Sequence, residues 1–262
     1  KPFMMWISFT HPHSPFVTTQ KYWDLYDHDD IDMPKVPPIP VDELDEMSRW
    51  LYYAHAQDLL TIKDEHVRNA RHAYYGMTSY IDDKVGRLME TLKAVGLADD
   101  TVVVFTSDHG EMLGERGKWF KQYFYEGSVG VPLIISHPDT YKPGRVSELV
   151  SLVDLLPTFM DIATDGSPPE QPGPLDGHSL TGLIQGDNSD WDNKVVSEYT
   201  GEGVIAPCRM VRRDNYKYIY THGHPPLLFD LDNDPLELAN LAGLPDVAEI
   251  EQALAAETLE DW

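Results

Sequence analysis

Apolar residues in the first part of the chain follow two kinds of spacing. Between Asp64 and Gly96 they recur at alternating steps of three and four, which predicts one long amphipathic helix with Asp64 at its start and Gly96 just beyond its end. Short continuous apolar runs, typical of buried strands, stand at residues 3–9, 101–106 and 131–136. Further helices are predicted at residues 44–60, 149–163 and 179–184. This alternation predicts an α/β fold in which helices flank a largely parallel central sheet.

The last third of the chain has a different pattern. Short runs that predict an antiparallel sheet stand at residues 195–199, 208–213 and 216–221. A final helix is predicted at residues 247–259. The Pro/Gly/Asp-rich stretch from Thr164 to Gly177 lies between the two patterns. We therefore expect an α/β domain in residues 1–177 and a small antiparallel sheet with a helix in residues 178–262.

Two side chains that can bind metal follow the run at residues 101–106, namely Asp108 and His109. In open α/β sheets, ligands bind beyond the carboxyl ends of the strands. Adjacent residues of a regular strand point to opposite faces, so both side chains can reach one ion only if the backbone leaves the extended conformation. Gly110 makes that turn easy. The alternative is that these residues only close a strand.

The glycine-punctuated loop that follows carries three basic residues, Arg116, Lys118 and Lys121. A metal ion with cationic donors nearby suits an anionic substrate. The alternative is that these side chains are solvated. Two histidines, His11 and His13, stand after the first apolar run among prolines that restrict their directions. A histidine pair can supply ligands or acid–base groups, or it can belong to a hydrogen-bonded structure.

Charge and composition narrow the classes of partner. The 262 residues include 20 Lys and Arg against 44 Asp and Glu, a formal net charge of -24, which argues against binding to nucleic acid or to an anionic membrane surface. A cationic substrate or simply an acidic surface fits better. The single cysteine, Cys208, excludes an internal disulfide framework. No apolar run is long enough to span a bilayer.

The segment Ser107–Lys121 resembles the sulfatases of the alkaline phosphatase superfamily, and among them the choline sulfatases most. The resemblance implies an alkaline-phosphatase-like α/β sandwich, of whose catalytic domain residues 1–177 would be part. It implies a divalent cation at Asp108 and His109, with calcium expected and manganese open. It also implies that His13 and Lys121 are catalytic residues that contact the sulfate, and that His11 is a weaker candidate for substrate binding.

Sulfatases make a formylglycine nucleophile from the Cys or Ser of a Cys/Ser-x-Pro-x-Arg motif. The segment Cys208–Arg212 does not match, because Met210 stands where proline should be, so we interpret Cys208 as structural. The paired metal-binding aspartates of the family also have no counterpart. The chain begins with Lys1 and has no signal peptide. We therefore expect a fragment or processed chain without the family's N-terminal segment, which by itself is not a working hydrolase.

The resemblance implies a sulfuric ester hydrolase that acts on choline sulfate, in a homo-oligomer, with the cytoplasm favoured. Glu198, beside Tyr199, is the first candidate to bind the quaternary ammonium group, and Glu202 is the second; a surface salt bridge is the alternative. Related phosphonate monoester hydrolases and phosphodiesterases offer a second function. A third hypothesis is a non-catalytic remnant that acts as a binding or assembly module.

Overall fold

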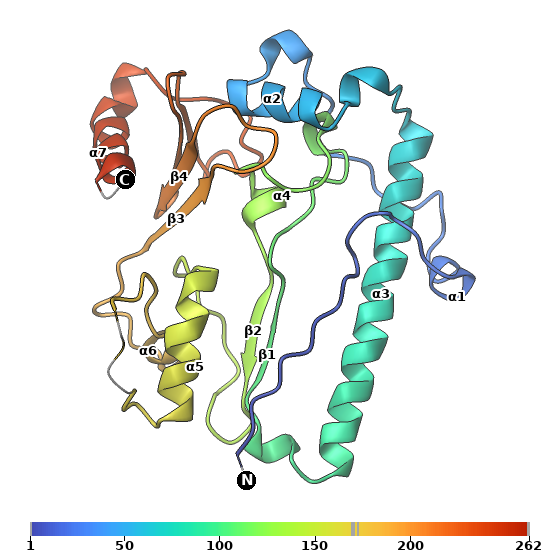
Figure 1. Cartoon of the computed structure of the whole chain (residues 1–262), viewed down its shortest axis with the longest axis vertical. Helices are drawn as coiled ribbons and strands as arrows, with labels where there is room; N and C mark the ends of the chain where they lie inside the picture. The colour runs from blue at the N-terminus through green and yellow to red at the C-terminus, as the bar shows by residue number, and fades with distance from the viewer. Residues whose placement is uncertain (1, 169–170, 172, 261–262) are drawn as a thin grey trace.

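The computed structural model describes residues 2–168, 171 and 173–260 and has a mixed α/β architecture (Figure 1). Its longest element is α3 (Asp64–Ala94), which runs along one side of the molecule. The predicted helix is confirmed, although Lys63 rather than Asp64 is the N-cap. Gly96 follows the C-cap with φ of 74°, a conformation that favours glycine and ends the helix.

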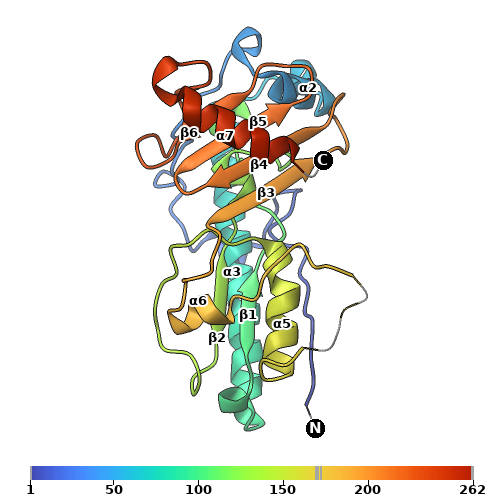
Figure 2. The same ribbon diagram turned by 90° about the vertical axis from the view of Figure 1, so that its left-hand side faces the viewer.

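The central pair of strands consists of β1 (Val103–Thr106) and β2 (Leu133–Ser136). They pair antiparallel, with Val103 opposite Ser136, so the predicted parallel arrangement is wrong for these two strands. Helices α5 (Leu155–Ala163) and α6 (Thr181–Gln185) pack against one face of the pair (Figure 2). The other face is open, because Phe105 is 37% and Ile134 59% exposed. The prediction of a strand buried on both faces is therefore also wrong in this chain.

The apolar run at residues 3–9 does not form the predicted strand. Residues 2–10 have no regular secondary structure, and the large apolar side chains among them are exposed. In the part of the chain that the structure describes, no strand pairs with this run. An extended segment becomes a strand only when a neighbour supplies its hydrogen bonds, which explains the difference.

A four-stranded antiparallel sheet forms the other end of the molecule. In spatial order its strands are β3 (Lys194–Tyr199), β4 (Cys208–Arg213), β5 (Tyr216–Thr221) and β6 (Leu227–Asp230). Helix α7 (Ala248–Leu259) covers one face, where Leu254 packs against Val211 and Leu228 (Figure 2). The opposite face packs on α2 (Glu46–Ala54) and on residues 112–125. The small antiparallel sheet with its helix was predicted correctly.

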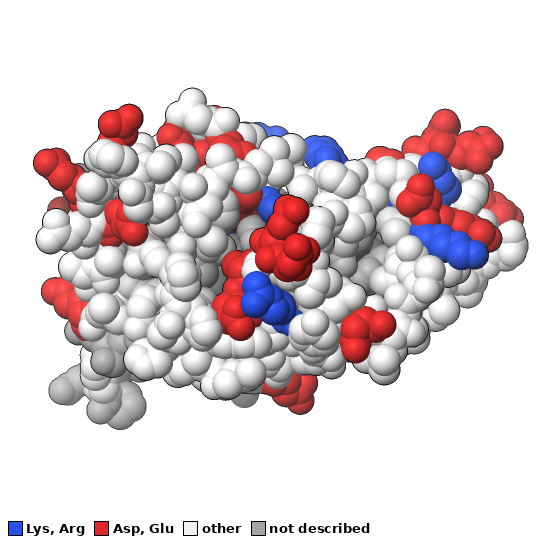
Figure 3. Space-filling model, turned by 90° about the horizontal axis from the view of Figure 1, so that it is seen from above, with Lys and Arg blue, Asp and Glu red and all other residues white. Residues whose placement is uncertain are grey.

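The remaining short helices connect these parts. The α-helices among them are α1 (Gln20–Trp23) and α4 (Glu126–Val129). The 3-10 helices are Val41–Glu43, Gln57–Leu59, Ala98–Asp100, Glu115–Gly117, Leu152–Asp154 and Pro245–Val247. None of the helices within the described ranges combines the length and apolar character that a membrane span requires. Acidic side chains cover more of the face shown in Figure 3 than basic ones, in keeping with the net charge of -24.

Candidate active site

Lys121 and His13 meet at the end of the N-terminal run. Lys121 Nζ lies 2.7 Å from His13 Nε2. His13 Nδ1 lies 2.7 Å from the carbonyl oxygen of Ser14, and because a carbonyl can only accept, Nδ1 carries the proton. Nε2 therefore offers its lone pair to the ammonium group of Lys121. The remaining N–H groups of Lys121 are free to bind an anion.

The end of β1 lies beside this pair. The rings of His109 and His13 are 6.2 Å apart and meet edge to face. His109 Nδ1 donates to the carbonyl oxygen of Gly110 at 2.7 Å, which leaves Nε2 as the free lone pair. Asp108 Oδ2 lies 3.7 Å from that Nε2 atom. The structure thus brings His13, Lys121 and His109 together, with the exposed carboxylate of Asp108 next to His109.

Asp108 and His109 fit the first two ligands of a divalent cation. Ligand atoms about 2.0–2.6 Å from one ion can be 3.7 Å apart, so both groups can bind the same ion without a change of backbone. Within the described ranges, no group of three or more His, Cys, Asp and Glu side chains could hold a metal. Water or further ligands must complete the shell, because calcium takes six to eight oxygen ligands.

Gly110 allows a close approach of two segments rather than an unusual turn. Its φ is not positive. A Cβ atom at this position would lie 2.2 Å from the carbonyl oxygen of Gly127, far inside contact distance. The N–H of Gly110 also donates to the carbonyl oxygen of Ser128 at 2.7 Å. The start of α4 therefore fixes the backbone that carries Asp108 and His109, and our explanation of Gly110 from the sequence was incomplete.

Glu111 ties the loop that carries Lys121, a role that the sequence analysis missed. Its Oε1 atom accepts the N–H groups of Phe120 at 2.5 Å and Leu113 at 3.2 Å. Burial raises the pKa of this carboxyl, and these N–H groups together with the charges of His109 and Lys121 oppose the rise. The carboxylate therefore joins both ends of the loop directly next to the candidate site.

Four residues of this loop that are not glycine have positive φ: Leu113, Arg116, Phe120 and Gln122, at 44°, 58°, 66° and 85°. Such conformations cost free energy and persist only where the surrounding structure imposes them. They often occur at functional sites. The loop is thus held in one shape by its packing, and Lys121 is held with it.

Arg116 and Lys118 do not face an anion as predicted. Arg116 is buried, donates to the carbonyl oxygens of Leu236 and Glu237, and stacks over Tyr125 at 4.3 Å. Lys118 is 3% exposed, and burial lowers the pKa of its ammonium group to about 8. Both side chains anchor the loop in the core, so of the three basic residues only Lys121 reaches the candidate site.

The structure does not join the other predicted residues to this group. The ring of His11 packs against Tyr80 of α3, with centroids 5.0 Å apart. Glu198 pairs with Arg209 Nε at 3.1 Å, the salt bridge that was the alternative to substrate binding. Glu202 lies in the exposed turn after β3, and its backbone carbonyl accepts the Tyr199 hydroxyl at 2.8 Å. The assignment of these three residues to substrate binding stays a prediction.

Comparison with known proteins decides the family. The sulfatase family model matches residues 1–165. The chain belongs to the sulfatase family. A second family model, for the C-terminal part of N-sulphoglucosamine sulphohydrolase, matches residues 114–261 of this sulfatase.

Individual relatives cover nearly all of this sulfatase chain. It is 42% identical to the choline-sulfatase of Rhizobium meliloti (strain 1021) over 94% of its length and 47% of that protein. It is 34% identical to arylsulfatase K of Bos taurus, over 94% of this chain and 49% of that protein. The phosphonate monoester hydrolase of Agrobacterium radiobacter superposes with a TM-score of 0.79 at 28% identity, covering 95% of this chain and 54% of that one. The chain spans about half the length of the curated relatives it matches.

Proposed function

We propose that this sulfatase hydrolyses sulfate monoesters, with choline sulfate as the first substrate to test. The contact between Lys121 and His13 beside the end of β1 carries the proposal, because it places a cationic donor pair next to a pair of metal-binding side chains. The similarity to a choline-sulfatase over nearly the whole chain supports the choice of substrate.

In sulfate ester hydrolysis a nucleophile forms a bond to sulfur while the bond from sulfur to the ester oxygen breaks. Negative charge grows on the equatorial sulfate oxygens and on the leaving oxygen. The free N–H groups of Lys121 donate to these oxygens, and the bond to His13 Nε2 fixes their direction. The same pair can hold a proton near the leaving oxygen. Lys121 and His13 thus act as preplaced donors, which need no rearrangement during the reaction.

Asp108 and His109 would hold the divalent ion that sulfatases generally use. Bound there, the ion would neutralise part of the sulfate charge. We propose calcium, because a carboxylate ligand and an incomplete shell open to further oxygen atoms suit it, with manganese as the alternative because His109 supplies a nitrogen.

We propose that the nucleophile, a formylglycine, comes from polypeptide outside the printed sequence. The printed residues contain no Cys/Ser-x-Pro-x-Arg motif. The exposed apolar side chains at residues 3–9 and on the open face of β1 and β2 support this proposal, since contiguous apolar surface is usually covered. Intact mass of the purified protein measures whether such a segment accompanies residues 1–262.

Of the two predicted carboxylates, Glu202 is the better placed for a cationic leaving group. Tyr199 bonds to the backbone of Glu202 and also to the side chain of Gln122, the neighbour of Lys121. The turn after β3 is thereby linked to the loop of the candidate site. Glu198 is already paired with Arg209, so we place it second.

Steady-state assays with choline sulfate, phenyl sulfate and a phenylphosphonate monoester test the function. We expect Lys121→Ala to reduce turnover of the sulfate esters by roughly 10²-fold, as for other lost transition-state donors. Lys142→Ala, which removes an exposed lysine, is the control and should have no effect. A preference for the phosphonate would favour the alternative that the hydrolase of Agrobacterium radiobacter suggests. No turnover by a protein whose mass includes the nucleophile segment would favour a non-catalytic binding module.

A further inference from the structure

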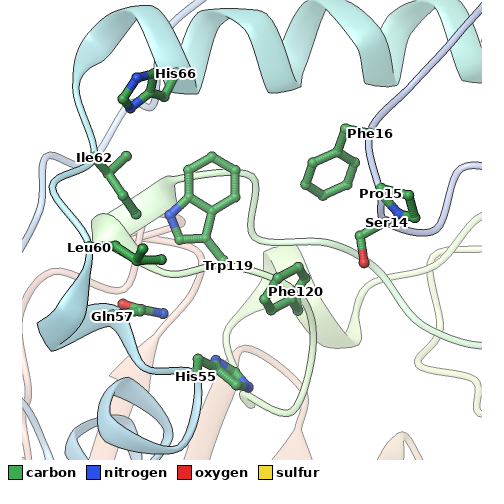
Figure 4. Close-up of a pocket in the computed structure, with 10 residues that line it drawn as sticks. All are labelled: Ser14, Pro15, Phe16, His55, Gln57, Leu60, Ile62, His66, Trp119 and Phe120. Atoms are coloured by element: carbon green, nitrogen blue, oxygen red, sulfur yellow. The ribbon is translucent and has the colours of Figure 1, made fainter.

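A cavity of about 500 Å³ opens next to the Lys121–His13 pair (Figure 4). Ser14 and Pro15, which directly follow His13, line one side of it, and Phe120, which directly precedes Lys121, lines its floor. A sulfate group held by Lys121 would therefore have the rest of its ester at the mouth of this cavity.

The lining of the cavity is mostly aromatic and aliphatic. The apolar side chains that shape it are Phe16, Leu60, Ile62, Trp119 and Phe120. Trp119 stands near the middle of the group, with Phe16 across from the side formed by His55 and Gln57 (Figure 4). Among the described residues that line the cavity, none is Asp, Glu, Lys or Arg. Flat apolar faces without a charged partner suit a ring more than an isolated ion.

The protonation of His55 follows from a chain of hydrogen bonds. The Tyr199 hydroxyl donates to the carbonyl oxygen of Glu202, so it can only accept from the side-chain amide of Gln122. That leaves Gln122 Oε1 to accept from His55 Nε2, 2.7 Å away. The proton of His55 is therefore on Nε2, and Nδ1 is a bare acceptor. Burial and the charge of Lys121 lower the pKa of His55, which keeps the ring in this neutral form at neutral pH.

Two polar atoms on this side of the cavity lack a partner. His55 Nδ1 is buried and has no hydrogen bond with any described residue. The same is true of Gln57 Nε2, on a side chain that is 8% exposed. Buried polar groups without partners are costly, so such atoms point to a missing ligand or water. Together they offer one acceptor and one donor, the complement of a hydroxyl group.

We propose that this cavity binds the leaving group of the sulfate ester, and that this group is a ring carrying a further hydroxyl. The inference rests on the proposed hydrolysis of sulfate esters for the identity of the ligand. The ring packs against Trp119 and Phe120, and its hydroxyl donates to His55 Nδ1 and accepts from Gln57 Nε2. Choline has no second donor and would leave both atoms unpaired, so the cavity extends the substrate range beyond choline sulfate.

Phenyl sulfate and 4-hydroxyphenyl sulfate form the matched substrate pair, since they differ only in the hydroxyl and their leaving groups are similarly acidic. We expect the purified protein to favour 4-hydroxyphenyl sulfate in kcat/KM by roughly tenfold, the effect of one to two neutral hydrogen bonds. Glucose 6-sulfate is a second arm, which distinguishes a sugar ring from an aromatic ring. Equal kcat/KM for the two phenyl esters, together with no turnover of glucose 6-sulfate, would overturn the proposal.

Two variants separate the two nitrogen atoms of His55. His55→Gln keeps a donor where Nε2 stands and deletes the acceptor, so the preference for the hydroxylated ester should fall to about onefold. His55→Asn keeps an acceptor where Nδ1 stands and should retain most of the preference. His66→Asn is the control, because His66 lines the same cavity but its Nδ1 already accepts the N–H of Lys63. Equal loss in all three variants would contradict the assignment to His55 Nδ1.

A binding measurement keeps this inference separate from the proposed function. Hydroquinone, which carries no sulfate, should bind the wild-type protein in a calorimetric titration and bind His55→Gln several-fold more weakly. Turnover of sulfate esters without any preference or dependence on His55 would leave the proposed function standing and overturn the inference. Hydroquinone binding that depends on His55, without turnover of any sulfate ester, would support the cavity and reject the function. Neither binding nor preference would overturn the inference.

Discussion

The ammonium group of Lys217 lies 2.7 Å from Glu237 Oε1, and both side chains are buried. Lys217 Nζ is also 2.6 Å from Glu126 Oε1 and donates to the carbonyl oxygen of Phe124 at 2.9 Å. Glu237 in turn accepts the N–H of Glu126, the first residue of α4. A single lysine of β5 thus binds the segment that follows the candidate active site.

Removing this lysine should be strongly destabilising. Lys217→Met leaves the buried carboxylate of Glu237 without its cation, and breaking a buried pair costs about 3–5 kcal/mol in the free energy of unfolding. Urea denaturation measures the change, with Lys142→Met as an exposed control. The double variant Lys217→Met/Glu237→Gln should recover part of the loss. A loss below about 1 kcal/mol would show that the pair behaves like an exposed ion pair.

Lys118 should make stability depend on pH in the alkaline range. Its ammonium group has a pKa of about 8 in the folded protein and 10.5 as the ordinary value. Below pH 8 both states are protonated and the cost of burying the charge is fully present. Between pH 8 and 10.5 the unfolded state binds more protons, so the free energy of unfolding contributed by Lys118 rises with pH.

The comparison with Lys118→Met isolates this effect, because other titrating groups are shared. At pH 7 we expect the variant to be more stable than the wild type by at most on the order of 3 kcal/mol. The advantage should shrink as the pH approaches 10. Urea unfolding at pH 7, 8, 9 and 10 measures both proteins. A difference that is constant over this range would contradict the lowered pKa.

Gly110→Ala should destabilise the protein and disturb metal binding. The added Cβ would lie 2.2 Å from the carbonyl oxygen of Gly127, and forced overpacking costs about 1–3 kcal/mol. Gly86→Ala is the matched control, since Gly86 lies in α3 with nothing within 4 Å of the new atom. That substitution should stabilise the helix by about 0.5–1 kcal/mol. Thermal unfolding of both variants checks the opposite signs.

Asp108→Ala and His109→Ala should each reduce the metal content of the purified protein. Each variant deletes one of the two ligands that lie 3.7 Å apart at the end of β1. Elemental analysis after dialysis gives the content, and calorimetric titration with calcium and with manganese gives the affinities. Asp99→Ala removes an exposed carboxylate elsewhere and should have no effect. Unchanged metal in both site variants would remove the assignment.

Glu202→Gln should raise the Michaelis constant for choline sulfate and spare phenyl sulfate. One exposed charge contact is worth up to about 1 kcal/mol, so we expect roughly a fivefold increase. Glu198→Gln should act mainly by breaking the pair with Arg209, with equal effects on both esters. A specific increase in Glu198→Gln alone would restore that residue as the first choice.

The sequence predicted the elements whose signals are local. The long amphipathic repeat of α3 and the dense β-forming runs of β4 and β5 need no information from distant parts of the chain. The pairing of β1 was different. An apolar strand can lie in a parallel or an antiparallel sheet, and only its neighbour decides; here Val103 lies opposite Ser136. The run at residues 3–9 likewise carries the strand signal but has no described partner.

The candidate site shows the same division. Asp108, His109, His13 and Lys121 were identified by residue type and by resemblance. The burial of Arg116 could not be foreseen, because its acceptors are carbonyl oxygens of residues 236 and 237, about half the chain away. A sequence shows that an arginine is charged but not that distant backbone atoms surround it. Glu111 was missed for a related reason, since its partners are backbone N–H groups that no side-chain motif records.

The bond between Lys121 and His13 closes a loop of 108 residues, whereas Asp108 and His109 are neighbours in the chain. Closing so long a loop costs entropy that later contacts must repay, so the bond forms only once α3 and the strands are in place. A partly folded chain could therefore hold both metal-binding side chains and still lack the donor pair. The catalytic geometry is in this sense a late product of folding, and it would be the first part lost when the molecule begins to open.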